Sequence, residues 1–235
     1  MKSGCYYYLA TLPALGELGS APPIEPVELM ELLADYPRLS RLVGAVLISD
    51  DLLQREAFLA GDREESDSAV LSRQQVRDEA PLPDYLTARS RDREVHVIQS
   101  DAIWESYFHY AAETGEAGGS RLLTQWVQFE ATLRNALAAA RAERLELDKA
   151  GYMVAEDLTD APDVVAAVVS AWAAAPTPLA GLRAVIAARW DWLRQHDPWF
   201  SFSEDELVAY AARLMLLEQW HRSSPKSEPT GNSAA

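Results

Sequence analysis

The chain has 235 residues, of which 49% are hydrophobic and 24% charged, so it can bury a substantial core and is not disordered as a whole. Its 21 lysine and arginine residues against 36 aspartate and glutamate residues give a formal net charge of −15. This charge repels phosphate backbones and anionic membrane surfaces, which disfavours nucleic-acid binding. The single cysteine, Cys5, cannot form an internal disulfide and therefore favours a reducing, cytoplasmic location.

Tyrosine, proline and glycine dominate the first 23 positions and predict an extended segment packed by its aromatic residues. The three tyrosines at positions 6 to 8 interrupt the apolar run that a signal peptide needs, so the segment is interpreted as mature sequence. A short helix is expected from Pro26 to Ala34. A longer helix is expected from Leu39 to Leu59, although GAVLIS within it can also form a brief strand.

The middle of the chain alternates breaks and helices. A charged loop at 61–67 and two prolines precede a helix expected from Asp84 to about Arg91. Apolar and aromatic residues at helical spacing predict a helix from Asp101 to Thr114, with Gly115 as its terminator.

The stretch from Ser120 to Leu147 carries the clearest helical pattern. One face holds apolar residues at steps of three and four, namely Leu122, Trp126, Phe129, Leu133, Leu137 and Ala140. Beside this stripe, Glu130, Arg134 and Arg141 form a charged flank, and Glu130 with Arg134 at i,i+4 can pair weakly.

Asn135 lies on the opposite side of the same helix, among alanines at 131, 138 and 142. One interpretation is a solvated, alanine-filled back face, which is preferred because such faces are common. The other is a second interface, where a helix approaches closely and Asn135 needs a specific hydrogen-bond partner.

The C-terminal third of the sequence predicts three more helices, the first of which needs to be distinguished from a membrane span. Nineteen residues without a formal charge, from Val164 to Leu182, approach the length of a membrane span, but Pro176 and Pro178 break them. A buried helix from Pro162 to Ala174 is therefore favoured over a span.

The next two helices carry start signals. Thr177 followed by Pro178 supplies an N-cap and a first-turn proline for a helix that runs to about Gln195. Ser203 and Glu206 form a capping box for a helix that ends near His221.

These elements predict an all-α, multi-helix fold of about eight helices. Residues 1–221 form a single helical domain, which the glycines at 115–119 or Gly151 can hinge into two lobes. The polar, proline-containing residues 222–235 form a disordered tail.

Few motifs in the sequence point to catalytic chemistry. The chain has no phosphate-binding glycine loop, GxSxG, HExxH or paired CxxC. His109 and Glu113 at i,i+4 can share a metal, but two ligands do not make a zinc site, and surface pairing is favoured. Asp50 and Asp51 resemble the aspartate-rich motif of helical terpenoid synthases, but the expected third acid is Gln54. No catalytic residue, metal or cofactor is predicted.

Three segments together resemble a family of uncharacterised bacterial proteins encoded within V/A-type ATPase operons. They are YYYLATLP at 6–13, FEATLRNALAAARAERLELD at 129–148 and FSFSEDELVAYAARLMLLEQW at 200–220. The middle segment also resembles helices of the C (or d) subunit of rotary ATPases, where an acidic residue is followed by an Asn-Leu-Arg type run. By that resemblance, Glu130, Arg134, Asn135 and Arg141 match the polar positions of the pattern.

The resemblance implies an all-helical protein without catalytic activity. The C subunit is a socket that joins the central shaft to the membrane ring, so the expected partners are central-stalk or membrane-ring subunits. The expected location is the cytoplasm, or the periphery of the inner membrane through the ATPase complex. The chain departs from the pattern in being shorter than a full C subunit, in lacking its three related lobes, and in the order Arg134-Asn135. A free-standing helical interaction or regulatory protein is the alternative.

Overall fold

The computed structural model describes residues 9–65, 67–87, 96–198 and 200–224. Within these ranges every regular element is helical and no strand is found, which confirms the all-α class. The longer helices are α2 (Pro26–Leu32), α3 (Pro37–Leu59), α6 (Gln99–Gly118), α7 (Arg121–Arg144), α8 (Ala166–Ala173), α9 (Pro178–Gln195) and α10 (Glu204–Arg222). The short ones are α4 (Arg73–Val76) and the 3₁₀ turns η1 (Asp84–Leu86), η2 (Lys149–Tyr152), η3 (Glu156–Leu158) and η4 (Pro162–Val165).

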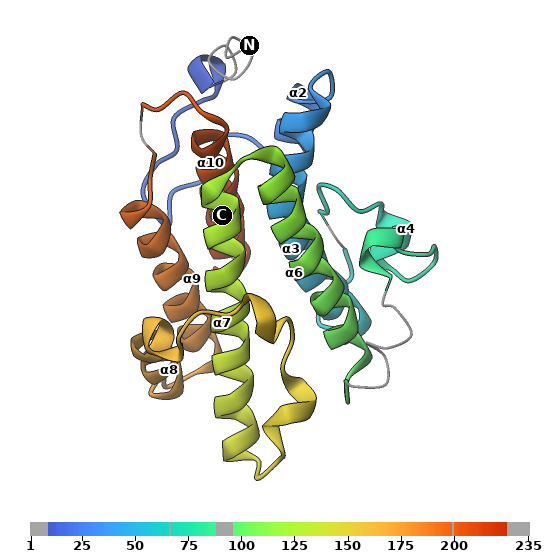
Figure 1. Cartoon of the computed structure of the whole chain (residues 1–235), viewed down its shortest axis with the longest axis vertical. Helices are drawn as coiled ribbons and strands as arrows, with labels where there is room; N and C mark the ends of the chain where they lie inside the picture. The colour runs from blue at the N-terminus through green and yellow to red at the C-terminus, as the bar shows by residue number, and fades with distance from the viewer. Residues whose placement is uncertain (1–8, 66, 88–95, 199, 225–235) are drawn as a thin grey trace, which may run out of the picture.

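Helices α7 and α10 occupy the centre of the molecule. Helix α7 runs down its middle with α10 behind it, α6 and α3 on one side and α9 on the other (Figure 1). Residues on opposite faces of α10, such as Leu214 and Leu216, are both fully buried. A helix that is apolar on every side belongs inside a protein, so α10 forms much of the core although it comes last in the chain.

Two of the predicted helix starts are confirmed. The Thr177 hydroxyl accepts a hydrogen bond from the amide of Ala180 at 3.1 Å, and Pro178 is the first residue of α9. At the start of α7, the Ser120 hydroxyl accepts from the amide of Leu123 at 3.1 Å. The cap at Thr177 depends only on neighbouring residues, which is why the sequence predicts it, whereas for α7 the sequence predicted the start of the helix and not its cap.

The predicted capping box at Ser203 is wrong. The Glu206 carboxylate accepts from the amide of Phe202 at 2.7 Å, one residue before the expected donor, and the Ser203 hydroxyl pairs with that of Ser201. Phe202 has a φ of 49°, and this left-handed turn brings its amide to the glutamate.

The predicted end of α6 at Gly115 is also wrong, because the helix continues to Gly118. A Cβ on Gly118 would lie 2.5 Å from Leu42 of α3, so this glycine permits close helix packing. The helix ends at Gly119, whose φ of 67° is left-handed.

Other expectations differ at the surface. Of the helix expected after Asp84, only the turn η1 is seen, and residues 88–95 lie outside the described ranges. The tyrosines at 6–8, Cys5 and residues 225–235 also lie outside them.

Helix α8 contacts α7 and α9 but has no fully buried residue, so the expected buried helix is wrong. No helix among the described residues combines the length and apolar character needed to cross a membrane. Arg222, assigned to the tail, is the last residue of α10.

Candidate partner-binding groove

A groove of about 1370 Å³ follows the lower half of α7, from Glu130 to the end of the helix. Its walls come from the second half of α3, the start of α6, the end of α8, the start of α9 and the last turn of α10. The walls are mainly apolar, with Leu133, Leu137 and Trp172 among them. Clefts of this kind, with a few convergent polar groups, are the usual binding sites of proteins.

Three arginine–carboxylate pairs stabilise the charged side chains that line this groove. Each pair joins two different helices, and the members are Glu130 with Arg189, Asp101 with Arg134, and Asp50 with Arg222. Because each carboxylate is bonded to a guanidinium, the buried charges are neutralised in place.

Glu130 is buried in the middle of α7. Arg189 of α9 donates two hydrogen bonds to its carboxylate, at 2.8 and 2.5 Å, in a bidentate arrangement. Burial raises the pKa of Glu130, while the charge and hydrogen bonds of Arg189 act in the opposite direction. The predicted i,i+4 pair of Glu130 with Arg134 is therefore wrong, since Glu130 turns toward α9.

Arg134 turns toward α6 instead. Its Nη2 donates to Asp101 Oδ1 at 2.9 Å, and its guanidinium lies 4.4 Å from the centre of the Trp104 ring. The Trp104 indole in turn donates to Glu56 Oε1 at 2.8 Å. Arg134 is thus held by charge and by an aromatic face, an arrangement that lysine does not reproduce.

Arg141 lies nearer the open end of the groove. Its guanidinium is 5.3 Å from the centre of the Trp172 ring of α8, and the residue is exposed. Arg141 and Arg144 have no ion pair among the described residues. The positive charges of these two arginines are therefore available to a ligand in the groove.

Asn135 lies outside the groove, on the other side of α7. It is buried, and its side-chain amide makes two hydrogen bonds with the backbone of Val154: Nδ2 donates to the carbonyl at 2.7 Å and the Val154 amide donates to Oδ1 at 3.0 Å. The preferred interpretation of a solvated back face is wrong. A second interface exists, but an irregular segment forms it in place of a long helix.

This irregular segment, residues 152–160, makes further hydrogen bonds with α6 and α7. The Asp160 amide donates to Thr132 of α7 at 2.8 Å, and the Ala155 amide donates to the Glu105 carboxylate of α6. Ala155 has a φ of 46°, a left-handed conformation that disfavours alanine. The segment therefore holds an unfavourable backbone geometry through its contacts with α6 and α7.

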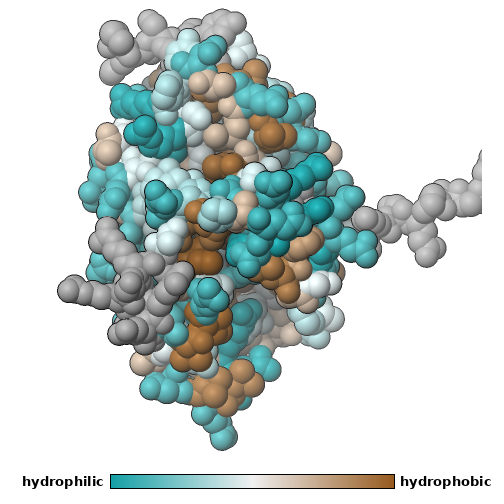
Figure 2. Space-filling model, turned by 90° about the vertical axis from the view of Figure 1, so that its right-hand side faces the viewer, coloured by the Kyte–Doolittle hydropathy of each residue, from teal (hydrophilic) through white to brown (hydrophobic). Residues whose placement is uncertain are grey.

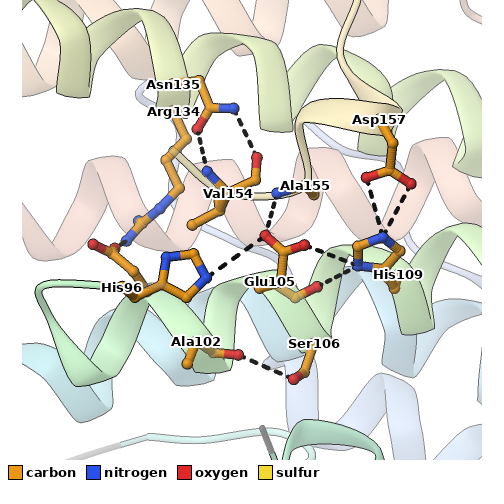
Figure 3. A network of polar contacts seen from close by, with 11 residues as sticks. His96, Ala102, Glu105, Ser106, His109, Arg134, Asn135, Val154, Ala155 and Asp157 are labelled. Carbon is orange, nitrogen blue, oxygen red and sulfur yellow. Dashed lines mark hydrogen bonds and ion pairs between the residues drawn. The ribbon is translucent and has the colours of Figure 1, made fainter. Parts of the chain in front are cut away.

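His109 also contacts this segment, from the exposed side of α6. Its Nδ1 lies 2.9 Å from the Glu105 carbonyl, and its Nε2 lies 3.2 Å from both carboxylate oxygens of Asp157 (Figure 3). Burial lowers the pKa of His109, but the hydrogen bonds and charges of Glu105 and Asp157 raise it above its usual value. The suggested pair with Glu113 is wrong, because Glu113 is exposed and His109 turns toward Glu105 instead.

Asp50 and Asp51 do not form a shared site for a metal diphosphate. Asp50 accepts from Gln54, Gln219 and Arg222, whereas Asp51 accepts from the backbone amides of residues 69–71 at 2.7 to 2.8 Å. Burial raises the pKa of Asp51 to about 7, against the effect of these amides. Asp50 thus connects α3 to α10, and Asp51 connects α3 to the loop at residues 69–71.

The sequence therefore identified one side of the groove and missed the other. Glu130, Arg134 and Arg141 line it as a flank of α7, but their partners Arg189, Asp101 and Trp172 come from other helices. The only sequence signal for these partners is an arginine or acid beside an apolar face, which many surface helices share.

Comparison with known proteins adds no further identification. The chain matches no protein-family model, no curated protein and no solved structure.

Proposed function

We propose that this protein is a non-catalytic subunit or assembly factor of a bacterial V/A-type ATPase, acting like the C (d) subunit in coupling the central stalk to the membrane ring. The proposal starts from the three resembling segments. The groove along α7 supports it, because a coupling protein needs a surface that binds another subunit.

The rim of the groove is the observation that carries the proposal. Leu59, Leu145 and Leu182 line it while remaining 53%, 67% and 46% exposed. Seen from the side of α3, α4 and α6, exposed hydrophobic side chains continue down to the end of α7 (Figure 2). Large apolar side chains gathered at the surface around a hollow are typical of protein interaction sites.

The charge of the groove favours an acidic partner. Its lining has six arginines, at 63, 134, 141, 144, 189 and 222, and four acids, at 50, 56, 101 and 130. The excess is positive, in a chain whose formal net charge is −15. A partner helix with an apolar face and flanking carboxylates is complementary to this surface.

A non-catalytic role agrees with the state of the buried acids. Glu130, Asp101 and Asp50 are each bonded to an arginine. General acid or base catalysis needs a group that can exchange its proton with a substrate, and a carboxylate locked to a guanidinium is poorly suited to it. The groove is therefore interpreted as a binding surface. In the proposed role the protein lies on the cytoplasmic side, held near the inner membrane by the ATPase complex.

Affinity capture tests the proposal. The tagged protein is expressed in cells that carry its gene, purified under native conditions and analysed by mass spectrometry. We expect central-stalk or membrane-ring subunits to be recovered with the wild type. The variant Leu182→Glu places a charge on the apolar rim and should reduce this recovery at least about tenfold.

Leu32→Glu is the matched control, because Leu32 is 50% exposed on α2 and does not line the groove. It should retain full recovery. Absence of ATPase subunits from the wild-type capture, with intact ATPase in the same lysate, would contradict the proposal. That outcome would favour a free-standing helical interaction protein.

A further inference from the structure

The contact between α6 and the 152–160 segment contains a set of metal-binding groups outside the groove. Glu105, His109 and Asp157 each offer one ligand atom, and these atoms lie within 4.8 Å of one another. Glu105 and His109 come from successive turns of α6, and Asp157 comes from η3 (Figure 3). The set combines one imidazole with two carboxylates from two separate segments.

The hydrogen bonding of His109 determines which ring nitrogen carries the proton. A backbone carbonyl can only accept, so the bond from His109 Nδ1 to the Glu105 carbonyl requires the proton on Nδ1. In the neutral ring Nε2 then presents a lone pair, which faces both oxygens of the Asp157 carboxylate at 3.2 Å. Two electron-rich groups at this distance need a cation between them, either a proton or a metal ion.

The surroundings of the set match those of known metal sites. Metal-binding histidines usually donate their other ring N–H to a carbonyl, and metal-binding carboxylates usually accept a hydrogen bond from nearby. His109 has the first feature. Glu105 has the second, through the amide of Ala155.

His96 provides an independent observation on the buried side of this set. Its side chain is only 5% exposed, and its Nδ1 makes no hydrogen bond to any described residue. Its Nε2 points at Glu105, 3.9 Å from Oε2, which is beyond hydrogen-bond distance (Figure 3). His96 therefore places a second imidazole beside Glu105 on the buried side of the set.

We propose that Glu105, His109 and Asp157 bind one divalent transition-metal ion, with Zn²⁺ the best fit, and that His96 positions Glu105. The imidazole selects a transition metal over Mg²⁺ or Ca²⁺, which prefer oxygen ligands alone. Asp157 is exposed, so water completes the coordination. The bound ion neutralises two carboxylates and fastens the 152–160 segment to α6, independently of what binds in the groove.

Calorimetric titration of the metal-free, full-length protein with Zn²⁺ tests this inference. We expect saturable 1:1 binding, and a melting temperature that rises when Zn²⁺ is added. Asp157→Asn and His109→Gln should each weaken the binding by more than about tenfold. Asp157 is exposed, so its variant should fold, and circular dichroism checks this for both.

Glu113→Gln is the matched control, because Glu113 is an exposed acid one turn beyond His109 on the same helix. It should bind Zn²⁺ like the wild type. Absence of saturable binding to the wild type would overturn the inference and leave His109 as a proton-binding group. Weak binding at several sites that neither Asp157→Asn nor His109→Gln changes would also overturn it, as adventitious binding to surface acids.

Discussion

The two halves of α7 are held by different kinds of contact. In the first half, Trp126 and Phe129 are buried against apolar and aromatic side chains, and Trp192 of α9 packs against both rings. From Glu130 onward, individual ion pairs and hydrogen bonds fix the polar residues, while the apolar surface beside them stays open as the groove. The first half supplies stability, and the second half presents a surface without leaving a buried charge unpaired.

Removing the largest side chain from the first half should have the greatest effect. Trp126 is 1% exposed, and its indole nitrogen has no hydrogen-bond partner among the described residues, so Trp126→Ala removes packing alone. We expect the free energy of unfolding to fall by about 3 to 5 kcal/mol. Urea denaturation measures this change, and Arg141→Ala, at an exposed site in the second half, should change it by less than about 0.5 kcal/mol. A loss below about 1 kcal/mol for Trp126→Ala would mean that the two halves do not differ as described.

Breaking the Glu130–Arg189 pair should have a smaller effect. Glu130→Ala leaves Arg189 without its partner, and because the Arg189 side chain is 17% exposed, water in the groove partly compensates. We expect a loss of about 2 to 3 kcal/mol, below the full cost of an unpaired buried charge. The double variant Glu130→Gln with Arg189→Met should be more stable than Glu130→Ala, since it removes both charges. If the double variant were less stable than Glu130→Ala, the unpaired charge of Arg189 would not be the cause of the loss in stability.

The smallest effect is expected on the opposite face of α7. Asn135→Ala leaves the amide and carbonyl of Val154 without their partners in a buried position, at a cost of about 1 to 3 kcal/mol. Hydrogen exchange should become faster at Val154 and Ala155 and stay unchanged in α10. Equal acceleration throughout the protein would mean that the 152–160 segment does not open separately from the core.

The sequence predicted features that depend on neighbouring residues and missed those set by distant ones. The start of α9 at Thr177 and the apolar stripe from Leu122 to Leu133 follow from local bonding and helical spacing. The end of α6 did not, because Gly118 is required by contact with Leu42, 76 positions earlier in the chain. A glycine alone does not reveal whether it ends a helix or lets another helix approach.

The same reason explains what was missed at the candidate site. Glu130 and Arg134 are one helical turn apart, so local pairing was the natural expectation. Their partners, Arg189 and Asp101, are 59 and 33 positions away. Asn135 binds backbone atoms, and backbone atoms of an irregular segment have no signature in an amino-acid sequence.

The contact between Asp205 and the start of α7 has a consequence for how the protein is made. The Asp205 carboxylate accepts hydrogen bonds from the Ser120 hydroxyl at 2.5 Å and the Leu122 amide at 3.2 Å, so the first turn of α10 completes the cap of α7. Helix α10 also fills the space between α3, α7 and α9. Until the ribosome has released the last helix, the apolar faces of the earlier helices have no common partner. The nascent chain therefore has to stay unaggregated until α10 has left the ribosome, because the core can form only once this helix is present.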